Sequence, residues 1–265
     1  MNLDRNNPIK ALIVDMDGVL WRQSQPIGDL PRIFEKIRQK NLKITLATNN
    51  ATLTVSQYLQ KLASFGVNLS PEQIVNSPQA AAAYMVEHFP RGSLVFVIGK
   101  DGLRQELQSQ GFVLSDGQAQ DVCAVVVGMD WDLRFEQLCQ ATLLLRAGAE
   151  FIATNSDRTF PTPQGLIPGV GAILALLETA TDRKPIVVGK PDPLMYQIAL
   201  QRMEVSPAEC LVVGDRLETD ILGGQNLGCK TALVLSGVTT LDQAQKWAPL
   251  PNMICQNLEE VVDRL

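Results

Sequence analysis

The chain has 265 residues, of which 46% are hydrophobic, and this is enough apolar side chain to fill the core of one or two domains. Its net charge of −5 and its scattered lysines and arginines argue against a nucleic-acid-binding protein. No apolar run approaches the roughly 18 residues of a membrane-spanning helix, and the first ten residues lack the apolar segment of a signal peptide. We therefore expect a cytoplasmic protein that binds neither nucleic acid nor membrane.

Short runs rich in β-branched residues alternate with amphipathic stretches along the chain. Continuous apolar runs separated by helices are typical of strands that are buried on both faces of a parallel sheet. The pattern therefore predicts the α/β class. In chain order the expected strands are residues 11–15, 43–49, 94–99, 123–128, 150–155, 185–190, 210–215 and 231–236.

Most of these runs end in a polar or charged residue. Ligands of an open parallel sheet bind beyond the carboxyl ends of its strands, so we expect these residues to meet at one site. Taken singly, each has an ordinary explanation, such as a helix cap for an aspartate or a solvated position for a lysine. Their coincidence favours a functional site. The residues are Asp15, Thr48, Asn49, Lys190 and Asp215.

Two acidic motifs add further carboxylates to the same edge. They hold Asp15 with Asp17, and Asp215 with Asp220. Four acids at one edge repel one another and call for a cation, and oxygen ligands with room for water suit Mg²⁺. A hydroxyl and an ammonium group opposite the acids are the partners that a phosphate needs. The combination predicts phosphoryl transfer.

Four motifs in this order resemble those of the haloacid dehalogenase-like phosphatases. Each is short, but each stands at the end of an expected strand, and the order makes the set specific. The resemblance implies a doubly wound parallel-sheet core. The motifs are DMDGVL at 15–20, TNN at 48–50, GKP at 189–191 and GDRLETD at 214–220.

More than 130 residues separate Thr48 from Lys190, and they contain their own alternation of strands and helices. This is similar to the inserted α/β cap of the class IIA subfamily, whose members include nitrophenylphosphatases and phosphoglycolate phosphatases. The segments ATNSDRTFP, PGVGA and VVGKPDP are also typical of that subfamily. We expect a catalytic core at residues 1–77 and 186–265, with a substrate-specificity cap at 78–185.

The resemblance also implies a role for each acid. Asp15 would be the nucleophile that forms an aspartyl phosphate, and Asp17 the general acid and base. Mg²⁺ would be held by the Asp15 carboxylate, the Asp17 backbone carbonyl and Asp215, with Asp220 acting through a bound water. Dehalogenases resemble this pattern without the second aspartate, so dehalogenation is not expected.

The remaining candidates concern the substrate. By the same resemblance, Thr48, Asn49 and Lys190 would bind the phosphoryl group, and Lys190 would also orient the nucleophile. A polar loop at residues 154–163 follows an expected strand of the cap and is a candidate specificity loop. Its candidate residues are Asn155 and Asp157.

The expected activity is hydrolysis of a small phosphorylated metabolite, with a homo-oligomer possible. Two alternatives stay open at this point. One is a phosphate-ligand binding or regulatory protein of the same fold, although such a protein would gain nothing from a general acid. The other is a phosphomutase, which would use the same acids and return the phosphoryl group to a sugar. The five cysteines are far apart in the sequence, and we interpret them as buried thiols without a metal or disulfide role.

Overall fold

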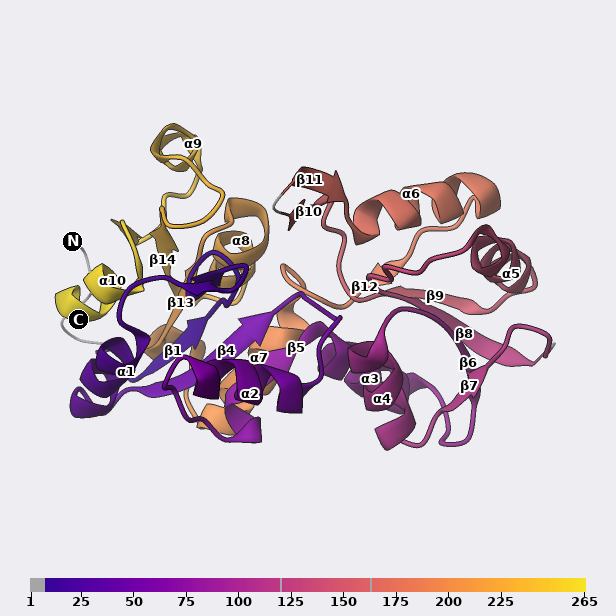
Figure 1. Cartoon of the computed structure of the whole chain (residues 1–265), viewed down its shortest axis with the longest axis horizontal. Coiled ribbons are helices and arrows are strands. Elements are labelled where there is room, and N and C mark those ends of the chain that lie inside the picture. The colour runs from indigo at the N-terminus through magenta and orange to yellow at the C-terminus, as the bar shows by residue number, and fades with distance from the viewer. Residues whose placement is uncertain (1–7, 120, 163) are drawn as a thin grey trace. The chain divides into compact units, whose positions relative to one another are not determined.

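A computed structural model describes residues 8–119, 121–162 and 164–265 (Figure 1). The chain divides into two compact α/β units. The core unit contains the described residues up to Thr48, together with Ser56–Val75 and Lys190–Leu265, and the inserted unit contains Asn49–Val55 and Asn76–Gly189. Residues 49–55, which come directly after β4 (Lys43–Thr48), belong to the inserted unit in this division. Residues 1–7 of the predicted core and Pro163 of the predicted specificity loop lie outside the described residues.

The core unit is built on a six-stranded sheet with β1 near its centre. From β15 to β4, neighbouring strands are parallel. Val14, the last residue of β1, pairs with Val213 on one side and with Leu46 on the other. The chain segments that follow these three strands therefore leave the sheet at the same edge. The order is β15 (Met253–Cys255), β14 (Lys230–Val234), β13 (Cys210–Gly214), β1 (Ala11–Val14), β4 (Lys43–Thr48) and β5 (Ile74–Asn76).

Helices cover both faces of this sheet, as expected for a doubly wound fold (Figure 1). On one face α1 (Leu30–Gln39) packs against α10 (Leu258–Arg264), and on the other α7 (Pro193–Met203) packs against α8 (Leu222–Asn226). The α1 helix buries Leu30, Ile33, Phe34 and Ile37, the spacing of one helical face. The unit also contains α2 (Val55–Ser64), α9 (Leu241–Lys246), the 3₁₀ turns η1 (Pro71–Gln73) and η2 (Pro207–Glu209), the π turn η3 (Leu217–Ile221) and the hairpin of β2 (Trp21–Arg22) and β3 (Gln25–Pro26).

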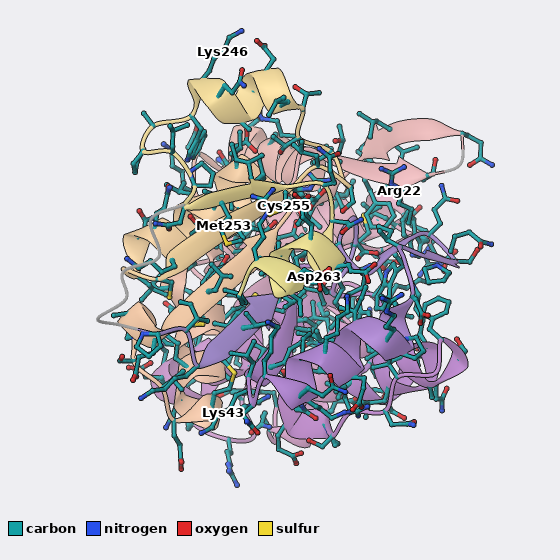
Figure 2. All side chains as sticks on the ribbon, turned by 90° about the vertical axis from the view of Figure 1, so that its left-hand side faces the viewer. Arg22, Lys43, Lys246, Met253, Cys255 and Asp263 are labelled. Atoms are coloured by element: carbon teal, nitrogen blue, oxygen red, sulfur yellow. The ribbon has the colours of Figure 1, made fainter. Side chains whose placement is uncertain are left out.

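Figure 2 shows side chains of the edge strand β15 and of the helix α9 in the core unit. Met253 and Cys255 of the edge strand β15 are 4% and 2% exposed, because α10 packs against this strand. Lys246, on α9, extends into solvent and pairs with Asp242 one turn earlier. Among the described residues, no helix is both long enough and apolar enough to cross a membrane.

The inserted unit has a parallel five-stranded sheet of its own. Its order is β12 (Ile186–Val187), β9 (Glu150–Ala153), β8 (Val122–Val127), β6 (Leu94–Ile98) and β7 (Val113–Ser115). The helices pack in two pairs, α3 (Ser77–His88) with α4 (Asp101–Ser109) and α5 (Phe135–Arg146) with α6 (Val170–Thr181). Figure 1 shows the two pairs on opposite faces of the sheet. An antiparallel hairpin of β10 (Thr159–Thr162) and β11 (Gly165–Pro168) precedes α6.

All eight strands expected from the sequence are present, and the α/β class is confirmed. The strands that the pattern did not predict are short, such as β5, β7 and β15, and none has a long β-branched run. The interpretation of all five cysteines as buried was wrong for Cys139, which is exposed on α5, and for Cys123, which is partly exposed. Both are small side chains, and only packing decides which way they point.

Candidate active site

Three acidic side chains meet at the carboxyl edge of the core sheet. Asp15 follows β1, Asp215 follows β13, and Asp220 lies in the π turn η3. They are 8%, 2% and 2% exposed, and one carboxylate oxygen of each lies within 4.8 Å of the others. The parallel register of β1 and β13 brings the first two together, although 200 residues separate them in the sequence.

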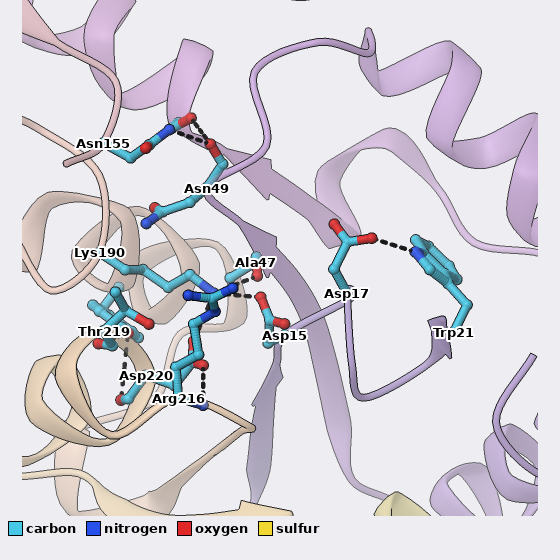
Figure 3. A network of polar contacts seen from close by, with 12 residues as sticks. Asp15, Asp17, Trp21, Ala47, Asn49, Asn155, Lys190, Arg216, Thr219 and Asp220 are labelled. Carbon is cyan, nitrogen blue, oxygen red and sulfur yellow. Dashed lines mark hydrogen bonds and ion pairs between the residues drawn. The ribbon is translucent and has the colours of Figure 1, made fainter. Parts of the chain in front are cut away.

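Lys190 is buried among these acids (Figure 3). Its ammonium group donates to Asp15 Oδ1 at 2.5 Å, to Asp220 Oδ1 at 2.7 Å and to the carbonyl oxygen of Ala47 at 3.0 Å. These bonds hold one oxygen of Asp15 in place. When all the groups are ionised, three buried carboxylates face one buried ammonium group, a net charge of −2 on these four buried groups, and the partly exposed Arg216 adds a positive charge near Asp215.

The pKa values of these groups reflect their burial first and the charges of their neighbours second. Burial raises the pKa of Asp15 well above its usual value, against the opposing effect of Lys190. Burial also raises the pKa of Asp215 to about 6, with a further contribution from Asp220. For Lys190, burial acts to lower the pKa, but the fields of Asp15 and Asp220 outweigh burial and raise it well above the usual value.

The chemistry of this donor set fits a divalent cation. Mg²⁺ prefers carboxylate, carbonyl and water oxygens, and the cluster supplies only oxygen donors apart from the Lys190 ammonium group. A 2+ charge would balance the net charge of −2 on the buried carboxylates and Lys190, and it would offset the cost of burying Asp15 and Asp215 in their ionised forms. The residues that would hold the ion are Asp15, Asp215 and Asp220.

Two glycines make room for Asp215. Gly18 has a φ of +87°, and a Cβ atom there would lie 2.5 Å from Asp215 Oδ2. A Cβ atom on Gly237 would lie only 1.8 Å from the same oxygen. The backbone N–H of Val238 donates to this oxygen at 2.8 Å, so the segment after β14 holds the carboxylate directly. Side chains at positions 18 and 237 would therefore displace Asp215.

We expect Gly237→Ala to weaken Mg²⁺ binding, because the added methyl group overlaps Asp215 Oδ2. The Mg²⁺ concentration needed for half-maximal activity should rise by about tenfold or more, the equivalent of one lost charge-assisted hydrogen bond. Gly148→Ala is the control, since its φ of +109° strains an alanine but no atom lies within 4 Å of the new Cβ. It should lower the melting temperature without changing the Mg²⁺ requirement. Equal Mg²⁺ requirements in both variants would contradict the prediction.

Asp17 lies apart from the three-acid cluster, and a different residue holds its side chain. The indole Nε1–H of Trp21 donates to Asp17 Oδ1 at 2.8 Å (Figure 3). Asp17 is partly exposed, whereas Asp15 is buried. The two acids of the DMDG motif therefore have different surroundings, and groups in different surroundings can carry out different chemistry.

The predicted phosphate-binding residues fall in both units. In the core unit Thr48, at the end of β4, is 2% exposed and its side chain is hydrogen-bonded to the hydroxyl of Tyr58 on α2. Burial raises the pKa of Tyr58 well above its usual value, so this hydroxyl stays protonated. Asn49 belongs to the inserted unit, where its backbone carbonyl accepts hydrogen bonds from Ser77 Oγ at 2.8 Å and Asn155 Nδ2 at 3.0 Å.

The two candidate specificity residues lie in the inserted unit, in the loop between β9 and β10. Asn155 is 5% exposed, and besides its bond to Asn49 its Oδ1 accepts the backbone N–H of Asp157 at 3.1 Å. Asp157 is partly exposed. The amide of Asn155 thus has a structural role inside its own unit, in addition to any role toward a substrate.

Sequence reasoning missed three contributors to the site. They are Trp21, Tyr58 and the backbone N–H of Val238. Trp21 stands four residues after Asp17, directly after the DMDGVL motif, and this spacing is a signal that the sequence does contain. Nothing in the sequence around Tyr58 or Val238 indicates a role, because tertiary packing alone brings them to the edge of the sheet.

Comparisons with known proteins agree with this geometry. Residues 12–113 match the family described as haloacid dehalogenase-like hydrolase, and residues 187–261 match the family described as HAD-hydrolase-like. An acid sugar phosphatase of Staphylococcus saprophyticus is 33% identical over 256 residues, which cover 97% of this chain and 98% of the relative.

Two solved structures that this chain resembles are also phosphatases. A p-nitrophenyl phosphatase from Archaeoglobus fulgidus superposes with a TM-score of 0.91 at 33% identity, over 97% of this chain and 100% of that one. A glycerol phosphate phosphatase from Mycobacterium tuberculosis, in complex with magnesium, superposes with a TM-score of 0.89 at 32% identity, over 96% of this chain and 76% of that one. The chain belongs to the haloacid dehalogenase-like hydrolases, in the class IIA subfamily of the nitrophenylphosphatases.

Proposed function

We propose that the protein is a Mg²⁺-dependent phosphatase that hydrolyses small phosphate monoesters through an aspartyl phosphate on Asp15. One observation carries the proposal: Asp15 is held by Lys190 within a cluster of three buried carboxylates at the edge of the core sheet. The relatives named above are phosphatases, and their names give sugar phosphates, nitrophenyl phosphate and glycerol phosphate as substrates, all of which are small esters.

In this mechanism Asp15 attacks the phosphorus atom and the leaving oxygen departs on the opposite side. Lys190 fixes Asp15 Oδ1 at 2.5 Å, so the carboxylate does not need to reorient before it attacks. The same ammonium group also donates to Asp220 and to the carbonyl oxygen of Ala47. In this proposal Lys190 orients Asp15 and would also contact the phosphoryl group at the same edge of the sheet.

Asp17 transfers the proton in both steps. It protonates the leaving oxygen when the aspartyl phosphate forms, and it removes a proton from the water that hydrolyses this intermediate. The Thr48 hydroxyl supplies a hydrogen bond to the phosphoryl group at the end of β4. Bound Mg²⁺ would neutralise charge on the phosphoryl oxygens and on the cluster of Asp15, Asp215 and Asp220.

The inserted unit serves as the cap in this proposal, with the limits predicted from the sequence at 78–185. Asn49 would contact the phosphoryl group, and Asn155 and Asp157 would select among esters. The protein would act in the cytoplasm, which the presence of five free cysteines favours. It would bind no nucleic acid, and a homo-oligomer is one possible state of assembly.

Mg²⁺ removal is the direct test of the proposed function. Activity on nitrophenyl phosphate and sugar phosphates should vanish in excess chelator and return with Mg²⁺, because the carboxylate cluster cannot accept an anionic substrate without the cation. Ca²⁺ should restore little, since it favours looser and higher coordination. Full activity in chelator would contradict the proposal.

The reaction products test the two alternative functions. Release of free phosphate, as opposed to an isomerised sugar phosphate, separates a phosphatase from a phosphomutase. Turnover of any ester excludes a protein that only binds phosphate ligands.

The raised pKa of Asp215 gives a pH dependence for metal binding. Its folded-state pKa of about 6 exceeds the ordinary value of 3.8, so the metal-free folded protein loses stability from this group as pH rises through that window. Mg²⁺ binds the ionised carboxylate, and its stabilising effect should grow over the same window. We expect the rise in melting temperature on adding Mg²⁺ to be larger at about pH 7.5 than at about pH 5. Equal shifts at both pH values would contradict this prediction.

A further inference from the structure

The contact between Trp21 and Asp17 joins the proton-transfer group to a separate structural element. Trp21 begins the β2–β3 hairpin and is fully buried, although tryptophan is rarely buried completely. Its indole N–H has one strong use here, the 2.8 Å hydrogen bond to Asp17 Oδ1. The N–H of a buried indole usually has a hydrogen-bond acceptor. For Trp21 the acceptor is the Asp17 carboxylate, to which the proposed mechanism assigns proton transfer.

The backbone between the two residues favours this contact. The N–H of Gly18 donates to the carbonyl oxygen of Trp21 at 2.8 Å, and Asp17 and Trp21 form an isolated β-bridge. The positive φ of Gly18 permits this tight turn. The chain therefore folds back on itself within four residues, and the indole reaches the carboxylate of its own motif.

Two residues, Lys61 on α2 and Phe65 directly after it, contact the ring of Trp21. The Lys61 ammonium group lies 4.0 Å from the centroid of the Trp21 ring, and the Phe65 ring lies 5.9 Å away at an angle of 41°. Lys61 also donates to the carbonyl oxygen of Gln23 in the hairpin turn at 3.0 Å. A cation over the ring face withdraws electron density from the indole, and this strengthens the N–H as a donor. The donor is thus fixed before any substrate binds.

We propose that Trp21 is the positioning residue of Asp17, and that Lys61 supports it by holding the indole. The hydrogen bond takes Asp17 Oδ1 and leaves the second oxygen to carry the proton in both chemical steps. Without the indole, the carboxylate would rotate between several orientations, and few of them would face the leaving oxygen. This inference rests on the proposed function, because it requires Asp17 to transfer protons.

The test is a double-mutant cycle between positions 17 and 21, measured in the full chain with Mg²⁺. Trp21→Phe keeps an aromatic ring and removes the donor, and it should lower kcat by about 10- to 100-fold with little change in KM. In the Asp17→Asn background the same substitution should cause little further loss, because the group that it positions no longer transfers protons. Single-turnover experiments can measure the rate constants of the slow variants.

Trp247→Phe is the matched control, because it also removes an indole hydrogen bond, here to Gln225 Oε1 at 3.2 Å on α8. It should leave kcat unchanged. If Trp21→Phe does not fold, Lys61→Met takes its place in the cycle, with a smaller loss that should again disappear in the Asp17→Asn background. Losses that multiply fully in the double variant would overturn the positioning role and leave the phosphatase proposal intact. A wild-type protein that hydrolyses no ester would overturn both.

Discussion

Asp15→Asn is expected to abolish turnover, with a loss in kcat of more than about 10⁴-fold. The substitution keeps the shape of the side chain and removes the nucleophile, so no aspartyl phosphate can form. Acid-quenched protein incubated with a labelled phosphate ester should carry label in the wild type and none in the variant. Retained label, or turnover near the wild-type rate, would rule out Asp15 as the nucleophile.

The same variant also reports on the charge balance of the cluster. Replacing one of three buried carboxylates lowers the uncompensated negative charge, so Mg²⁺ should stabilise the variant less than the wild type but still measurably. Melting temperatures with and without Mg²⁺ measure this difference. Asp242→Asn is the control, because Asp242 is a solvent-exposed aspartate on α9 that pairs only with Lys246 in the described contacts. It should change neither the turnover nor the response to Mg²⁺.

Asp17→Asn should show a different defect, a loss of about 10²–10⁴-fold in kcat with esters that have poor leaving groups. The nucleophile and the three-acid cluster stay intact, and Trp21 can donate to the new amide oxygen as it donates to the carboxylate. Proton transfer is lost from both steps. Nitrophenolate leaves without much protonation, so with nitrophenyl phosphate the first step should suffer less than the second.

The aspartyl phosphate on Asp15 should therefore build up in the Asp17→Asn variant, and nitrophenol should appear in a burst. Rapid-mixing absorbance gives the burst amplitude, and acid quenching gives the amount of phosphoprotein. The Trp247→Phe variant, altered far along the chain from the acidic motif, should show neither effect. The same small loss with good and poor leaving groups, without a burst, would show that Asp17 is not the proton-transfer group.

The positions of these acids followed from the sequence to a large extent. Asp15 and Asp215 end continuous apolar runs, and such runs predict buried parallel strands whose carboxyl ends share one edge. The structure brings the two together with Asp220 and Lys190 in that way. This part was predictable because strand periodicity is local, and the direction of a parallel strand then fixes where its last residue points.

The sequence by itself determined the α/β class, through the alternation of apolar runs and amphipathic stretches. It also determined the positions of the eight expected strands and which acids stand at their ends. Only the tertiary structure decided how each acid is held. The 2.5 Å bond from Lys190 to Asp15 joins residues 175 positions apart, and Gly237 and Val238 reach Asp215 from the end of another strand. The different surroundings of Asp15 and Asp17, two residues apart, likewise depend on Trp21 being packed by α2. The contacts made by Lys190, Val238 and α2 arise from the packing of distant segments, and no local pattern of side chains encodes them.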